Sequence, residues 1–179
     1  MTTFTNRMIG AAKLDARIYE EVEADKSAFG QAMLVVVLSS AAAGIGTIEK
    51  TGMGGILLGA LIALAGWYIW AFLTYLIGTK FLPEAQTRST HGELLRTIGF
   101  SSSPGLVRIL AVIPGLMWIV FLIAGIWMFI AMVIAVRQAL DYQSTLRAVG
   151  VCLIGWIIQA IIVGIFLALF GGSGDAPPA

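Results

Sequence analysis

Charged side chains are scarce in this sequence of 179 residues, and they are unevenly distributed. Only 12% of the residues are Asp, Glu, Lys or Arg, whereas a soluble domain carries about 25%. An ionised group at the centre of a bilayer costs roughly 2.5–3.5 kcal/mol, so long uncharged windows indicate membrane spans. Four windows contain a single charged residue between them, Arg108: residues 31–48, 53–77, 106–136 and 148–170. The sequence therefore predicts a polytopic, all-α integral membrane protein.

Cysteine and histidine are scarce as well, and this excludes several kinds of functional site. The one cysteine, Cys152, has no second thiol for an intrachain disulfide, and the one histidine, His91, belongs to no Cys/His cluster with metal-ligand spacing. A net charge of +1 with scattered basic residues gives no electrostatic footprint for nucleic acid. The sequence predicts no nucleophile and base, and no group of metal ligands, close enough to act together. We therefore expect no enzymatic activity and no cofactor.

The order of apolar and polar stretches predicts three regions. Residues 1–30 form a cytoplasmic, amphipathic and largely solvated lead-in helix, with Phe4 and Met8 on its apolar stripe. Residues 31–170 form the transmembrane domain. The small, Gly- and Pro-rich residues 171–179 are expected to be a disordered tail.

The third membrane element is predicted to be broken. Thr90 and Glu93 have the spacing of a capping box, which starts a helix near His91. The helix then meets Ser-Ser-Ser-Pro-Gly at residues 101–105, where Pro104 removes a backbone donor and favours an extended Ser103.

Residues 91–113 can cross the membrane or dip in and return. Crossing gives five spans and places more Lys and Arg on the cytoplasmic side than returning does, and the positive-inside rule favours that arrangement. We therefore expect a bundle of five transmembrane helices, with the third broken at residues 101–105 and the N-terminus in the cytoplasm.

Three stretches resemble the Yip (Ypt-interacting protein) family of membrane domains, in its bacterial form. The first is Ile-Tyr-Glu-Glu-Val-Glu-Ala-Asp-Lys-Ser at residues 18–27, which opens into the first span. The second is Gly99-Phe100 followed by Pro104, similar to the family's Gly-aromatic-x-x-x-Pro signature, with Phe where many relatives have Tyr. The third is the polar loop between the last two spans, from Arg137 to Arg147.

The resemblance implies five spans with a cytosol-facing N-terminus, in agreement with the charge distribution. In eukaryotes such proteins are tied to Rab-type GTPases and vesicle traffic. The long cytosolic N-terminal region of those members has no counterpart in this sequence, so we carry over no GTPase role.

The broken element supplies one set of candidate functional residues. Arg108 can extend to the membrane interface, or it can act as a functional charge beside the free backbone groups of residues 101–105. With Arg96, it would favour an anionic solute in a channel or permease, which is the alternative function. The candidate broken-helix site is Arg96, Gly99, Phe100, Pro104 and Arg108.

Small residues at helical spacing supply a second set, because they let helix backbones approach closely. These stripes pack this bundle internally or contact another chain. The sequence favours a scaffold or accessory subunit of the bacterial cytoplasmic (inner) membrane, with membrane lipids and other integral membrane proteins, or a second copy, as partners. The candidate packing or partner face is Gly55, Gly59, Ala63, Gln159, Ala160, Gly164 and Ala168.

Overall fold

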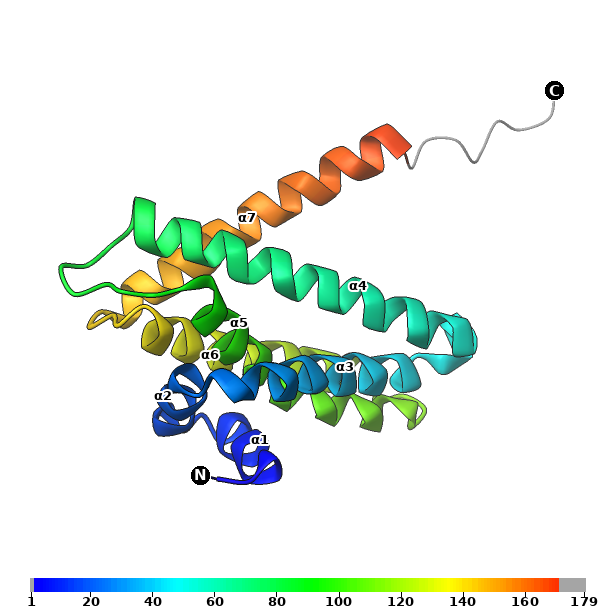
Figure 1. Cartoon of the computed structure of the whole chain (residues 1–179). Coiled ribbons are helices and arrows are strands. Elements are labelled where there is room, and N and C mark those ends of the chain that lie inside the picture. Colours follow the sequence, from blue (N-terminus) through cyan, green and yellow to red (C-terminus); the bar gives the residue numbers. More distant parts are fainter. Residues whose placement is uncertain (1, 171–179) are drawn as a thin grey trace.

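The computed structural model describes residues 2–170, except for the side chains of residues 49–51, 163 and 166–170. This part of the chain is all-α, with seven α-helices joined by short turns, by other helical segments and by a longer loop over residues 82–90 (Figure 1). The elements are α1 (Phe4–Ala12), α2 (Ala16–Ala24), the 3₁₀ turn η1 (Lys26–Ala28), α3 (Phe29–Gly46), α4 (Ile48–Leu76), the π-helical turn η2 (Ile77–Phe81), α5 (His91–Phe100), the 3₁₀ helix η3 (Ser103–Val112), α6 (Met117–Ala139) and α7 (Thr145–Phe170).

Four helical stretches within the described residues are long and apolar enough to cross a membrane. They confirm the prediction of a helical membrane protein, although a set of five such helices is not found. The stretches are Lys26–Gly46, Gly52–Phe81, Met117–Ala139 and Thr145–Ile162.

The element expected as the third span is broken, as predicted, into two helices of ten residues each, α5 and η3. The capping box is confirmed: the Thr90 backbone N–H donates to Glu93 Oε2 (2.7 Å), and the Glu93 N–H donates to Thr90 Oγ1 (3.3 Å). The extended conformation expected at Ser103 is wrong. The chain tightens there into a 3₁₀ helix, because Pro104 lies in the first turn, where a missing N–H removes no helical hydrogen bond.

The corner between α3 and α4 lies beside the corner between η3 and α6. Both corners line one cavity. Ile45 and Gly46 come from the first corner, and residues 111–115 come from the second. Gly52 kinks α4 near its start, because its φ of 63° and ψ of −177° are a non-helical conformation that is essentially restricted to glycine.

The opposite end of the bundle is held by hydrogen bonds between its two polar loops. Glu84 accepts from the backbone N–H groups of Gln143 (2.8 Å) and Ser144 (3.3 Å), and these bonds hold the pKa of the Glu84 carboxyl below its usual range. Tyr142 Oη donates to Leu82 O (2.7 Å). Helix α5 begins at this end, and η3 ends at the other.

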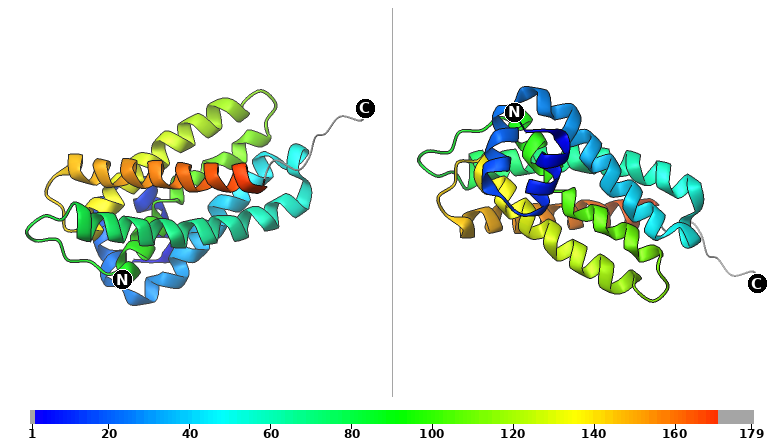
Figure 2. Two further views of the ribbon diagram at one scale, coloured as in Figure 1. Left: turned by 90° about the horizontal axis from the view of Figure 1, so that it is seen from above. Right: turned by 90° about the horizontal axis from the view of Figure 1, so that it is seen from below.

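The N-terminal segment differs from the expected single, solvated helix. It forms two helices, α1 and α2, which pack against the bundle near the end where α3 begins (Figure 2). Leu14 has φ 64°, which ends α1, and the Asp15 side chain caps α2. Tyr19 and Val22 are fully buried, and Trp127 Nε1 of α6 donates to Ala12 O (2.8 Å).

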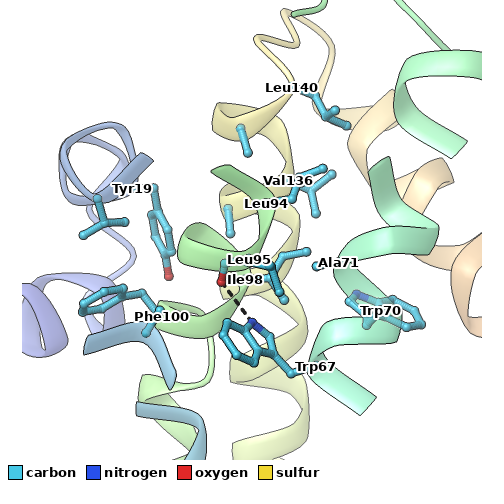
Figure 3. Packing of buried hydrophobic residues seen from close by; sticks show 14 of the residues in the cluster. Tyr19, Trp67, Trp70, Ala71, Leu94, Leu95, Ile98, Phe100, Val136 and Leu140 are labelled. Atoms are coloured by element: carbon cyan, nitrogen blue, oxygen red, sulfur yellow. Dashed lines mark hydrogen bonds between the residues drawn. The ribbon is translucent and has the colours of Figure 1, made fainter. Parts of the chain in front are cut away.

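Helix α5 lies at the centre of the packed core. Every residue from Leu94 to Phe100 is buried, and α5 contacts α2, α3, α4 and α6. Figure 3 shows Trp67 of α4 reaching α5, where its Nε1 donates to Leu95 O (2.9 Å). A helix surrounded in this way is positioned by packing rather than by contact with lipid.

Helix α7 packs on the bundle through its first half. Ala148, Val151, Cys152 and Gly155 are buried, whereas the described side chains beyond Ile158 are exposed. Toward its C-terminal end α7 diverges from α4 (Figure 1). The tail expected to be disordered, residues 171–179, lies outside the described residues.

Candidate functional site

A cavity of about 260 Å³ lies at the middle depth of the bundle, where α3 to α7 and η3 come together. Its polar lining consists of serines, a glutamine, tryptophan N–H groups and one arginine, and it contains no carboxylate. The lining residues are Val36, Ser39, Ser40, Ala63, Gly66, Trp67, Trp70, Ile98, Ser101, Ser102, Arg108, Met128, Met132, Trp156 and Gln159.

The burial of these residues shows where the cavity opens. Ser39 and Trp70 are 3% and 6% exposed and form its floor, whereas Trp156 on α7 is 55% exposed. Gln159, one turn further along α7, is also exposed. The mouth therefore lies on the α7 side of the bundle.

Arg108 is the charged residue of the cavity. Its side chain contacts α6. One terminal nitrogen donates to Met128 Sδ (3.0 Å), and the guanidinium lies 5.6 Å from the centre of the Phe121 ring. Its buried Nε has no hydrogen-bond partner, and no described carboxylate lies within ion-pair distance of Arg108.

Arg96, the second arginine expected at this site, lies elsewhere. Its guanidinium donates to the carbonyl oxygens of Val22 (2.9 Å) and Glu23 (3.1 Å) at the end of α2. A cation placed there satisfies carbonyl groups that a helix leaves free at its C-terminus. Arg96 therefore attaches the N-terminal helices to α5.

The Glu23 side chain beside this contact has a raised pKa, of about 7. Burial is the main cause, and the carboxylates of Asp141, Glu93 and Glu20 add to it, while Arg96 acts in the opposite direction. This carboxyl group belongs to the polar end of the bundle and not to the cavity.

Gly99, Phe100 and Pro104 have packing roles. A Cβ at Gly99 would lie 2.7 Å from Ala32 Cβ, so glycine allows α5 to approach α3 closely. Phe100 meets Phe4 edge to face, with ring centroids 6.5 Å apart, and Pro104 is buried. Of the five residues predicted for the broken-helix site, Arg108 alone lines the cavity.

Sequence reasoning missed the contributions of Ser101, Ser102 and Trp70. The sequence pattern marks the two serines only as part of the helix break, although their small polar side chains lie next to Pro104 inside an apolar region. Trp70 Nε1 is buried without a hydrogen-bond partner, and nothing in the sequence around it marks the position.

The small-residue stripes take little part in packing this chain. Gly59 and Gly164 have open space where a Cβ would stand, and Ala160 and Gln159 are exposed. Ala63 is half-buried against the core and lines the cavity, and Gly55 is half-buried. The side chain of Ala168 lies outside the described part of α7.

Comparison with protein-family models, with curated proteins and with solved structures finds no match for this chain. The resemblance to the Yip family therefore stays a prediction. Among the described residues, no group of His, Cys, Asp or Glu side chains is placed to hold a metal ion.

Proposed function

We propose that this protein is a non-enzymatic scaffold or accessory subunit that binds another membrane-spanning helix along the outer half of α7. The observation that carries the proposal is the open face of α7, where Gln159, Ala160 and Gly164 are exposed within an apolar helix. The partner is a transmembrane helix of another integral membrane protein or of a second copy of this chain.

Gln159 supplies the hydrogen-bonding group of this face. Lipid tails offer no hydrogen-bond partner to an amide, whereas an adjacent helix does, and such bonds between helices contribute about 0.6–2 kcal/mol. Ala160 and Gly164 have small side chains that allow a second backbone to come close. A polar residue flanked by small residues is therefore suited to helix–helix contact.

Site-specific photo-crosslinking in the native membrane tests this role. With a benzophenone amino acid at Ala160, we expect one adduct of defined mass, which Gln159→Leu weakens severalfold. The matched control carries the same group at Ile119, an exposed residue near the start of α6. An unreacted monomer at both positions, or identical adducts from both, would contradict the proposal.

We also propose that α5 and η3 together make a fifth crossing, as the charge distribution and the Yip resemblance imply. Ten α-helical residues span about 15 Å and ten 3₁₀ residues about 20 Å, enough for a hydrocarbon core of ~30 Å. The location of the two ends of this element at opposite ends of the bundle supports the proposal. The expected membrane is the bacterial cytoplasmic membrane.

A topology assay distinguishes five crossings from four. Reporters fused to the N- and C-termini are expected to report opposite sides of the membrane, with the N-terminal one in the cytoplasm. Alkaline phosphatase, active outside the cytoplasm, and a fluorescent protein, active inside, give complementary signals. Both termini on the same side would show that residues 91–113 do not cross.

A further inference from the structure

We propose that the cavity around Arg108 binds the anionic group of a ligand, a carboxylate or a phosphate, within the membrane. The source of that group is an anionic lipid or fatty acid, or a free anion. The cavity shares Gln159 with the α7 face assigned to a partner helix, but Arg108 and Trp70 lie outside that face, so the two roles are tested with different variants.

The first support is the charge of the cavity. The Arg108 guanidinium is half-buried, with its Nε fully buried, and a counter-charge would stabilise it, because an uncompensated charge away from water is unfavourable. Arg108 interacts with a thioether sulfur and an aromatic ring, and both interact weakly with a cation compared with a carboxylate. No lining residue is acidic, so a bound anion would supply the missing charge.

The second support is the unpaired hydrogen-bond donors. Trp70 is 94% buried, and its Nε1 has no hydrogen-bond partner. The neighbouring buried tryptophan of the lining, Trp67, does have one, because its Nε1 donates to Leu95 O of α5. Arg108 Nε is unpaired as well. An oxyanion accepts several N–H bonds at once, and bonds to a charged acceptor are about twice as strong as neutral ones.

The third support is the shape of the cavity. Besides its polar groups, the cavity is lined by Trp156, Met128 and Met132, which are large and apolar, and Trp156 is exposed at the mouth. A charged group in the cavity and an apolar side chain at its opening match an amphiphile that enters from the bilayer. A small free anion would occupy the same floor without using the mouth.

The experiment uses the full-length protein in detergent and follows the fluorescence of the tryptophans. Dibrominated stearate, a carboxylate whose bromines quench indole, is compared with its neutral methyl ester. We expect the acid to quench saturably and at lower concentration than the ester, because Trp67, Trp70 and Trp156 line the cavity. In a second arm, thermal stability is compared in sodium phosphate and in sodium chloride of equal ionic strength.

Two substitutions locate the effect. Arg108→Gln is expected to weaken binding of the acid about tenfold or more, the loss expected for a charge-assisted contact, and Arg108→Lys to retain part of it. The matched control, Arg88→Gln, removes a positive charge from an exposed loop residue and should leave binding unchanged. Trp70→Phe keeps the aromatic ring, removes the N–H and is expected to weaken binding severalfold.

A structural role for Arg108 predicts a different result. If the arginine served only to stabilise the bundle, Arg108→Gln would lower the melting temperature without changing the ratio between acid and ester. We expect the melting temperature of Arg108→Gln to equal or exceed that of the wild type, because a half-buried charge without a counter-charge is removed.

Each outcome decides the proposal. If the acid quenches more strongly than the ester, and Arg108→Gln removes this difference, the result supports an amphiphile as the source. Stabilisation by phosphate alone, lost in Arg108→Gln, supports a free anion. Equal quenching by acid and ester with no effect of phosphate, or unchanged binding in Arg108→Gln, overturns it.

Discussion

Replacing Arg7 with alanine is expected to release the N-terminal helices from the bundle. Arg7 is 2% exposed and forms ion pairs with Glu21 (2.8 Å) and Asp25 (2.7 Å). It also donates to Gln31 Oε1 (3.0 Å), which links α1 to the start of α3. The substitution removes the charge that α1 supplies to these two carboxylates and leaves them close together, so amide hydrogen exchange in α1 and α2 should accelerate by about tenfold or more.

Hydrogen exchange measured by mass spectrometry resolves this local effect from global unfolding. Arg17→Ala is the matched control, because Arg17 pairs with Asp15 (2.9 Å) but is 86% exposed, and exposed ion pairs contribute little. Its exchange in α1 and α2 should match that of the wild type. Equal acceleration in both variants, or none in Arg7→Ala, would show that the buried pairs do not hold the segment.

The features of this fold that follow from local chemistry could be predicted from the sequence. Windows without charge mark the spans, because the cost of burying a charge in lipid acts on each residue separately. The capping box of Thr90 and Glu93 needs only residues three apart, and the break before Pro104 needs only the missing N–H.

The features that depend on distant partners could not be predicted. Arg96 bonds to Val22 and Glu23, more than seventy residues away, and nothing near Arg96 in the sequence indicates carbonyl oxygens as its partners. The sequence predicts a solvated helix around Arg7, whereas its three partners are Glu21 in α2, Asp25 directly after α2 and Gln31 in α3. Charge marks these residues as polar, but only the packed structure decides which of them is buried.

The same distinction applies to the candidate site. The sequence singles out Arg108 because it is the one charge in its apolar window. The side chains around it come from α3, α4, α6 and α7, so their convergence depends on how the helices pack. The close approach of η3 to α3 positions Arg108. This approach depends on a glycine, Gly46, whose role nothing in the neighbouring sequence indicates.

Replacing that glycine, Gly46, with alanine is therefore expected to disturb both the fold and the cavity. A Cβ at Gly46 would lie 2.5 Å from the Arg108 carbonyl oxygen and 2.9 Å from Ala111 Cβ, and neither atom can rotate away. Overpacking of this kind costs about 1–3 kcal/mol. At about 2–4 °C for each kcal/mol, the melting temperature should fall by roughly 2–12 °C.

Because the clash acts on the backbone of η3, it should also displace Arg108 and weaken the binding of dibrominated stearate. The matched control is Gly125→Ala in α6, where nothing lies within 4 Å of a Cβ. That variant should keep the wild-type melting temperature or exceed it, because alanine favours a helix over glycine. A melting temperature in Gly46→Ala as high as in Gly125→Ala would mean that η3 can move without cost, and the packing of η3 on α3 would then not position the arginine.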